Sequence, residues 1–385
     1  MKTFKVLSID GGGIKGLYPI SVLRHFEEAL RQEHGDDARI VDYADLICGT
    51  STGGLIALAL ALRIPTETIC QFYEQHGPKI FQGSEGWAAW IRQMMLGGKF
   101  SDTPLRTAIT DILKDHTIGD SHSLLCIPTY DFTQGSYEVF KFDHKEGNLT
   151  RHNKIPMVDV ALATSAAPTY FPLAQVALEN NSQYVDGGVW ANNPSLVGFL
   201  ESIWHFVGQG KSYEHLHLLS IASLNVGTGK PPLLHRHRSF RHWRSDLFDM
   251  SLIGQSEFAH VFLQAIHSQK SIPLTYARIP SAVIVGEQVH YIKLDYASER
   301  SFALMKQLAA DMYYKFRKTP EVQTFFTTRK TYFTQPSPQP RHRKNEGQAL
   351  ESNTSKRVAG TWPIWILGFI SSTWFTLLRR KNRVD

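Results

Sequence analysis

The sequence predicts an α/β protein, because strand-like runs lead twice through glycine-rich turns into apolar helical runs. The first strand-like run spans residues 5–9 and ends in the turn DGGGIKG at 10–16. The second spans residues 43–48 and continues through GTSTG at 49–53 into an apolar helical run at 55–62. Strands that alternate with helices are typical of this fold class. The 385 residues are enough to bury one large core.

Ser51 stands in the second turn in the way that a nucleophile has to be presented. A sharp turn from strand to helix needs neighbours without side-chain bulk, and Gly49, Gly53 and Gly54 provide them. Such a turn lifts the hydroxyl clear of the backbone, while the helix that follows directs its first N–H groups to the same place. The spacing therefore predicts a nucleophile elbow centred on Ser51.

Gly11, Gly12 and Gly13 form the first turn, and a helical run from Leu17 to Leu30 follows them. Consecutive glycines leave backbone N–H groups uncovered, so that an anion can approach them. The anion is either a phosphate or the oxyanion of an acyl-transfer intermediate. The chain has no GxxxxGK[ST] motif after this strand, and the nucleophile elbow elsewhere in the chain favours the oxyanion.

Asp186 ends a third strand-like run, at residues 183–186, and two glycines follow it. A serine hydroxyl is a poor nucleophile until a base accepts its proton, and a buried carboxylate within about 3 Å can do so directly. Small residues after Asp186 would allow Ser51 to come that close. We therefore predict that Asp186 is the base.

These motifs together resemble the patatin-like phospholipases. DGGGIKG at 10–16, GTSTG at 49–53 and DGG at 186–188 occur in the order of that family, and ATSAAPTYFP at 163–172 fits it as well. The resemblance covers roughly residues 1 to 310. It implies a three-layer α/β/α fold with a central, mostly parallel sheet. It also implies calcium-independent, phospholipase A-type hydrolysis of membrane phospholipids through an acyl-enzyme, without a metal or another cofactor.

The resemblance assigns a role to each matching residue of the motifs. Ser51 is the nucleophile and Asp186 the base of a dyad without histidine, and Asp10 anchors the glycine loop. The oxyanion-hole residues are Gly11, Gly12 and Gly13, with Lys15 as support for the loop.

Two other kinds of protein remain alternatives at this stage. One is an α/β-hydrolase esterase with a Ser–Asp–His triad, whose histidine would be His205, His215 or His217, all downstream of Asp186. The other is a membrane-tethered binding module on a dead hydrolase fold, which the intact serine, carboxylate and glycine loop argue against.

The chain changes character towards its C-terminus. We expect a hydrolase domain at residues 1–320, a polar, basic linker at 321–357, an uncharged apolar helix at 358–378 and a basic tail at 379–385. A helix of 21 residues is about 31 Å long, close to the thickness of the hydrocarbon layer of a bilayer. The expected location is therefore the cytoplasmic side of a membrane, anchored through this helix; an interfacial helix or a helix docked on the core are the alternatives.

Three cysteines without metal-like spacing (Cys48, Cys70 and Cys126) are consistent with a reducing compartment.

A second basic cluster lies at residues 235–244, in a chain whose net charge is +6. A solvated loop, a contact to lipid headgroups, a contact to nucleic acid and a pocket for an anionic regulator all agree with its composition. The chain is similar in length and in its N-terminal glycine loop to bacterial patatin-like lipases that a cyclic dinucleotide switches on in anti-phage defence. That similarity implies a cyclic dinucleotide activator and a phospholipid membrane as partners, with no nucleic acid expected. The residues that would bind the phosphates are Arg236, Arg238, Arg241 and Arg244.

Overall fold

A central sheet organises the protein. The computed structural model describes residues 2–334 except 82–98, 228, 230–239 and 270–271. Within these residues, the sheet has the strand order β5-β6-β3-β2-β1-β7-β8, with β4 also paired to β3. The strands are β1 (Thr3–Ile9), β2 (Leu46–Gly49), β3 (Leu124–Asp131), β4 (Ser136–Lys141), β5 (Ala174–Val176), β6 (Ser182–Asp186), β7 (His215–Ile221) and β8 (Leu274–Ile279).

The sheet is parallel in its centre and antiparallel towards one side. Strands β3, β2, β1, β7 and β8 run parallel to one another, whereas β4 and β6 pair antiparallel with β3, and β5 pairs antiparallel with β6. The parallel strands are buried along most of their length, as expected where helices cover both faces. The carboxyl ends of β1 and β2 lie side by side, with Ile9 paired to Gly49. The two predicted glycine turns therefore meet at one edge of the sheet, which we call the carboxyl edge.

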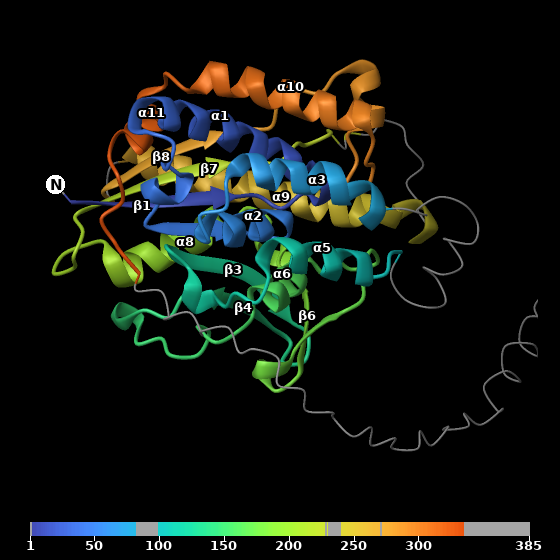
Figure 1. The fold of residues 1–385 in the computed structure, drawn as a ribbon, viewed down its shortest axis with the longest axis horizontal. Coiled ribbons are helices and arrows are strands. Elements are labelled where there is room, and N and C mark those ends of the chain that lie inside the picture. The colour runs from blue at the N-terminus through green and yellow to red at the C-terminus, as the bar shows by residue number, and fades with distance from the viewer. Residues whose placement is uncertain (1, 82–98, 228, 230–239, 270–271, 335–385) are drawn as a thin grey trace, which may run out of the picture. The chain divides into compact units, whose positions relative to one another are not determined.

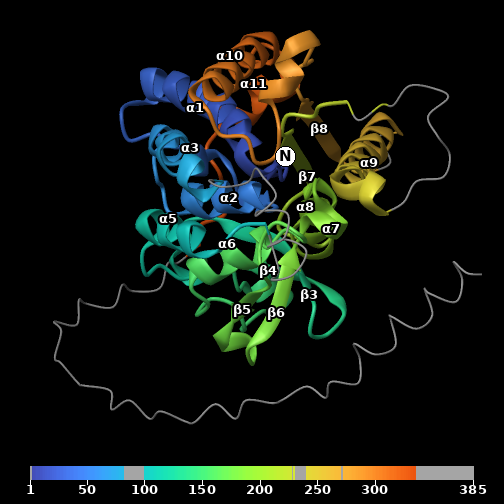
Figure 2. The ribbon, with the colours of Figure 1, turned by 90° about the vertical axis from the view of Figure 1, so that its right-hand side faces the viewer.

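Helices cover both faces of the sheet, which confirms the predicted three-layer α/β/α fold (Figures 1 and 2). Figure 2 shows α1, α2, α3 and α5 on one side of the sheet and α7, α8 and α9 on the other. The first group comprises α1 (Leu17–His34), α2 (Thr52–Ala61), α3 (Thr66–Ile80) and α5 (Thr103–Leu113), and α6 (Met157–Ser165) packs against α2 and α5. The second group comprises α7 (Gly188–Ala191), α8 (Ser195–Glu201) and the long α9 (Phe240–Gln269).

Two local differences from the sequence expectation have simple causes. The strand expected at 43–48 begins at Leu46, because residues Ile40–Tyr43 form a 3₁₀ turn before it. Helix α2 begins at Thr52 rather than at the expected Leu55, because the chain turns into the helix directly after Ser51.

The domain continues beyond residue 320, where we expected the linker to begin. Helices α10 (Glu299–Phe316) and α11 (Pro320–Thr327) pack on the domain, and Phe325 and Phe326 of α11 are buried. The amides of Thr331 and Tyr332 then donate hydrogen bonds to Asp45 Oδ1, at 2.8 and 2.7 Å. Residues 321–334 are therefore part of the folded domain. The sequence did not reveal this, because the segment is held by Asp45, which is more than 280 residues earlier in the chain.

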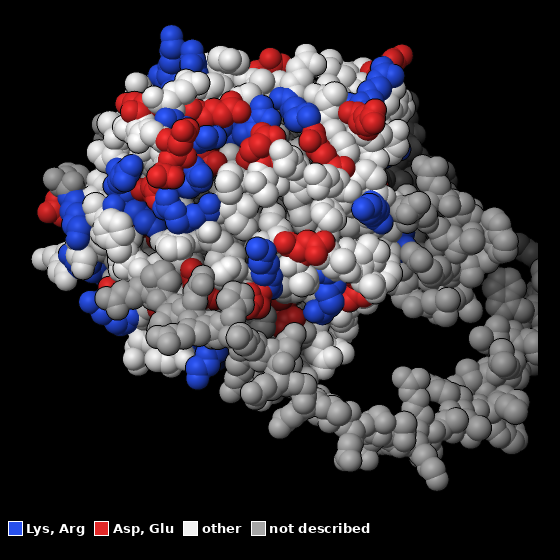
Figure 3. Space-filling view, in the orientation of Figure 1, with Lys and Arg blue, Asp and Glu red and all other residues white. Residues whose placement is uncertain are grey.

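The predicted apolar helix at 358–378 and the basic tail lie outside the described residues. No helix in the described part of the chain has both the length and the apolar character needed to cross a bilayer. On the face shown in Figure 3, acidic and basic side chains are intermixed rather than separated by sign.

Replacing Phe325 tests whether residues 321–334 belong to the core. Phe325 is fully buried and lies edge-on to the rings of Phe326 and His217. We expect Phe325→Ala to lower the free energy of unfolding by about 3 to 5 kcal/mol, because it leaves a cavity. Phe333→Ala, which changes an exposed ring, is the matched control. Equal urea midpoints for the two variants would contradict this assignment.

Candidate active site

Ser51 lies in the tight turn between β2 and α2. Its backbone has φ 55° and ψ −125°, a conformation that residues other than glycine rarely adopt. The glycines around it are required by close contacts: a Cβ on Gly49 would lie 2.1 Å from the carbonyl oxygen of Gly53, and one on Gly53 would lie 2.4 Å from that of Ile9. The turn is thus the strained elbow that the sequence predicted.

Two threonines hold this turn in place. The Ser51 amide donates a hydrogen bond of 3.0 Å to Thr164 Oγ1, and that hydroxyl donates one of 2.6 Å to the carbonyl of Pro128 in β3. On the other side, Thr50 Oγ1 donates to the carbonyl of Ala191 at 2.6 Å. The strained residue is therefore tied to β3, α6 and α7, and such surrounding contacts are what allow a strained backbone to persist.

Asp186 reaches Ser51 from the end of β6. Ser51 Oγ donates a hydrogen bond of 2.7 Å to Asp186 Oδ2, and the Gly188 amide donates one of 2.7 Å to Asp186 Oδ1. Because β6 runs antiparallel to β3, its carboxyl end turns back towards the elbow. A Cβ on Gly187 would lie 2.2 Å from the carbonyl oxygen of Pro128, so the chain passes there only without a side chain.

Burial sets the protonation of this carboxyl group. Removal from water raises the pKa of Asp186 to about 7, while the hydrogen bonds from Gly188 and Ser51 favour the ionised form and limit the rise. A carboxylate with a pKa near neutrality is a better proton acceptor than an ordinary aspartate.

The glycine loop supplies amides on the same side of Ser51. The Gly11 amide is used within the fold, because it donates to the carbonyl of Asn192 at 3.0 Å. The amides of Gly12 and Gly13 have no acceptor within the described part of the chain, and both residues line the same pocket as Ser51 and Asp186. Of the three predicted oxyanion glycines, Gly12 and Gly13 therefore offer donors, whereas Gly11 has a structural bond.

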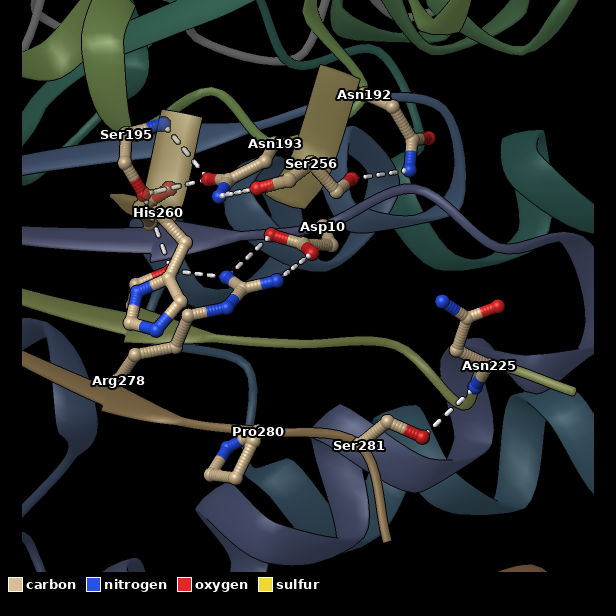
Figure 4. A network of polar contacts seen from close by, with 12 residues as sticks. Asp10, Asn192, Asn193, Ser195, Asn225, Ser256, His260, Arg278, Pro280 and Ser281 are labelled. Atoms are coloured by element: carbon tan, nitrogen blue, oxygen red, sulfur yellow. Dashed lines mark hydrogen bonds and ion pairs between the residues drawn. The ribbon is translucent and has the colours of Figure 1, made fainter. Parts of the chain in front are cut away.

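An ion pair fixes the start of this loop. Asp10 accepts hydrogen bonds of 2.5 and 3.2 Å from the guanidinium of Arg278 in β8, and Arg278 also donates to Ser220 Oγ in β7 at 2.6 Å (Figure 4). Both members of the pair are almost fully buried. Asp10 is therefore part of a link across three neighbouring strands, in agreement with its expected role as an anchor.

Lys15 lies in the 3₁₀ turn Gly13–Gly16 that closes the loop. Burial lowers the pKa of its ammonium group to about 8, and the negative charge of Asp249 in α9 opposes this shift. The lysine thus interacts with α9 from the turn that follows the glycines.

Helix α9 also supports the turn that follows Asp186. The Asn192 side chain donates to Ser256 Oγ at 3.0 Å, and the Asn192 amide donates to Gln255 Oε1 at 3.3 Å. Because Asn192 accepts the bond from Gly11, these contacts connect α9 with the glycine loop as well.

A pocket lined by Ser51 and Asp186 opens to solvent, and its empty space, counted with the adjoining solvent, is about 790 Å³. Its polar groups, from Ser51, Asp186 and the glycine loop, gather in one part, and most of its remaining lining is apolar or aromatic. The apolar lining includes Leu55, Phe72, Tyr73, Ile80, Phe81, Leu105, Tyr170, Phe171, Leu252 and Leu294. A pocket with mostly apolar walls and a few convergent polar groups suits a largely apolar ligand.

Known proteins share this chain's motifs. The profile of the family described as "Patatin-like phospholipase" matches residues 7–197. A protein named cGAMP-activated phospholipase from Pseudomonas aeruginosa is 33% identical over 265 residues, which are 69% of this chain and 76% of the relative. The chain belongs to the patatin-like phospholipase family. This is a family of lipid acyl hydrolases.

Two further relatives show how widely these patatin-like sequences occur. The cGAMP-activated phospholipase of Vibrio cholerae is 32% identical over 231 residues, which are 58% of this chain and 64% of the relative. Patatin-like protein 3 of Arabidopsis thaliana is 33% identical over 220 residues, which are 51% of each chain. The matched region thus spans about half of this plant relative.

The three candidate triad histidines lie away from the dyad of this patatin-like site. His215 and His217 pair with Thr3 and Lys5 in the first half of β1, whereas Ser51 lies beyond the last strand residues. His205 contacts the ring of His144 instead. In the part of the chain that is described, none of the three is hydrogen-bonded to Asp186, so the arrangement is a Ser–Asp pair without histidine.

The four arginines proposed for a regulator are not placed against a ligand. Arg236 and Arg238 lie outside the described residues. Arg241 and Arg244 belong to the first turns of α9, but their side chains also lie outside what is described. Among the described residues, no group of His, Cys, Asp or Glu side chains is arranged to hold a metal ion.

Sequence reasoning missed three residues that hold the site together. Thr164 lies within the stretch at 163–172 that fits the family, so a signal for it was present. Asn192 and Arg278 lie outside the quoted motifs, and only the folded chain brings them to Gly11 and Asp10.

Replacing Thr164 with valine tests the support of the elbow. Valine has nearly the shape of threonine but no hydroxyl. In Thr164→Val the Ser51 amide therefore loses its acceptor, and Ser51 is no longer held in position. We expect hydrolysis of p-nitrophenyl butyrate to fall roughly 10- to 100-fold, because small displacements of reacting groups are costly. Thr107→Val, which changes an exposed threonine bonded within α5, is the control. An unchanged rate in Thr164→Val would contradict the proposed support.

Proposed function

We propose that the chain is a calcium-independent phospholipase A-type enzyme in which Ser51 and Asp186 act as a catalytic dyad. The observation that supports this best is the 2.7 Å hydrogen bond from Ser51 Oγ to Asp186 Oδ2 in a pocket with apolar walls. Membership of the patatin-like family and the names of its relatives support a lipid ester as the substrate.

The reaction begins when Ser51 Oγ attacks the carbonyl carbon of the ester while its proton passes to Asp186 Oδ2. The new C–O bond places a negative charge on the carbonyl oxygen. The amides of Gly12 and Gly13 bind this oxyanion, and each well-placed donor stabilises it by about 3 kcal/mol. The positive charge of Lys15, in the turn that closes the loop, also favours this negative charge.

Collapse of the intermediate breaks the bond between the carbonyl carbon and the alcohol oxygen. Asp186 returns its proton to that oxygen, and the lysophospholipid leaves with the acyl group still attached to Ser51. A water molecule then attacks the acyl carbonyl and gives its proton to Asp186. The second collapse releases the fatty acid and restores the Ser51 hydroxyl with that proton.

The relatives named cGAMP-activated phospholipases support a regulated form of this activity. The chain is switched on by a cyclic dinucleotide, and Arg236, Arg238, Arg241 and Arg244 bind its phosphates. The enzyme then acts on the cytoplasmic side of a membrane, to which residues 358–378 anchor it, and degrades phospholipid as an anti-phage response. Basic residues on either side of that segment agree with contact to anionic lipid.

Removing either member of the dyad tests the proposed chemistry. With calcium chelated, we expect wild-type protein to release fatty acid from phospholipid vesicles, with cGAMP added where activation is needed. Ser51→Ala and Asp186→Asn should each lower release by about 10³-fold or more, because nucleophile and base act as one unit. Ser101→Ala and Asp159→Asn, which lie outside the pocket, are controls. Release that persists in either dyad variant would contradict the mechanism.

The pKa of Asp186 predicts how the activity depends on pH. Only the ionised carboxylate can accept the Ser51 proton, and burial raises the pKa of Asp186 to about 7. We therefore expect kcat/KM for p-nitrophenyl butyrate to rise with pH through about 7, reach a plateau above it and fall roughly tenfold per pH unit below it. A profile that stays flat between pH 5 and pH 8 would exclude Asp186 as the base.

A further inference from the structure

Helix α9 carries an exposed apolar face. Five large apolar side chains of this helix point away from the domain. Their exposed fractions are 55% for Leu247, 41% for Met250, 67% for Phe258, 59% for Val261 and 43% for Phe262. We call these five residues the outer face of α9.

The five residues form one stripe along the helix. Separations of three, four, eight and eleven residues among them place them on the same side of α9. The exposed residues Gly254 and Ala265 occupy other positions on that side, so its centre carries no charge. Asp249 lies off the stripe and interacts with Lys15, and Glu257 lies at its margin.

The opposite side of α9 is already packed on the domain. Leu252, Ala259 and Leu263 are buried there, and Ser256 is hydrogen-bonded to Asn192. A helix that is apolar on both sides is normally covered on both, and contiguous exposed apolar surface on a soluble domain commonly marks an interaction site. Within the described part of the chain, the outer face is therefore the surface of α9 that is free to interact with a partner.

The outer face lies beside the pocket that holds the dyad. Leu252, two residues after Met250, lines that pocket. Helix α9 runs antiparallel to β8, with His267 bonded to the start of the strand at Leu274 and His260 bonded to Tyr276 further along. The residues before Ser256 consequently extend past the carboxyl edge of the sheet, where the substrate has to enter (Figure 1).

We propose that the outer face of α9 docks on the surface of an anionic phospholipid bilayer and holds the pocket against it. The proposal rests on the proposed function, because a phospholipase must take its substrate from a bilayer. Exposed phenylalanine and aliphatic side chains enter the boundary between headgroups and acyl chains, and nearby basic residues are attracted to anionic lipid. The described part of the helix supplies the apolar side chains, and Arg241 and Arg244 belong to its first turns in the sequence, before Leu247.

A fluorescent label on the outer face tests this contact directly. Phe258→Cys and Phe262→Cys would each be made in full-length protein that also carries Ser51→Ala, and labelled with nitrobenzoxadiazole. Cys48, Cys70 and Cys126 are buried, so the label goes to the introduced thiol. The matched control is Trp204→Cys, whose side chain is 60% exposed in the segment that leads to Phe206, a residue stacked on Phe4 near the start of β1.

We expect the emission at positions 258 and 262 to increase and shift to the blue when vesicles of phosphatidylglycerol and phosphatidylethanolamine are added. Pure phosphatidylcholine vesicles should give a weaker response, and the label at 204 should give none. The absence of a response at 258, or an equal response at 204, would overturn the proposal. A response to raised protein concentration without vesicles would also overturn it, in favour of a second copy of the chain.

Catalysis provides a second readout in protein that retains Ser51. The double variant Phe258→Ser with Phe262→Ser should hydrolyse vesicle phospholipid about tenfold more slowly or worse, because buried apolar area at the bilayer is lost. Hydrolysis of p-nitrophenyl butyrate, which is dissolved in water, should stay at the wild-type rate. An equal loss on both esters, or no loss on vesicles, would contradict lipid docking. If wild-type protein cleaves neither ester, the proposed function fails, whereas the label experiment still decides where the chain meets the bilayer.

Discussion

The hydrogen bond between Ser51 and Asp186 requires three backbone turns to come together at the carboxyl edge of the sheet. A hydroxyl and a carboxylate 2.7 Å apart leave no room for bulk on the segments that carry them. The contacts that a Cβ would make at Gly49, Gly53 and Gly187 lie between 2.1 and 2.4 Å and involve backbone carbonyls that have no space to move. The glycines of the motifs therefore serve close packing of backbone on backbone, and the chemistry depends on that packing.

The same edge needs polar groups beneath it, because closely packed turns bury many backbone amides and carbonyls. Asp10 and Arg278 provide such polar groups next to the glycine loop, and Thr164 provides one next to the turn that carries Ser51. Each of these side chains bonds to a different strand or helix. The reacting atoms are thus supported from several elements at once, which is how a site on loops can reach the precision of one on rigid elements.

The meeting of Ser51, Asp186 and the glycine loop could be predicted from the sequence because each lies at the end of a short strand beside glycines. Local patterns of this kind can be recognised without knowledge of the fold. The antiparallel direction of β6 could not be predicted, since it depends on pairing with β3 more than 50 residues earlier in the chain. Arg278 lies 268 residues from Asp10, and nothing in its own neighbourhood distinguishes it from a surface arginine. The packing of residues 321–334 was missed for a related reason, because the segment is held by Asp45, which is distant in sequence.

Both ends of the described chain lie at the edge of the sheet opposite to the catalytic one. The chain enters through β1 at Thr3, and at the other end Thr334 donates a hydrogen bond to Ser121, just before β3. Domains whose ends lie near one another on the surface tolerate insertion into other proteins. This hydrolase domain can therefore be joined to further polypeptide at either end, or at both, while its substrate entrance stays unobstructed. Such an arrangement suits an enzyme that is combined with different sensors or tethers without change to its chemistry.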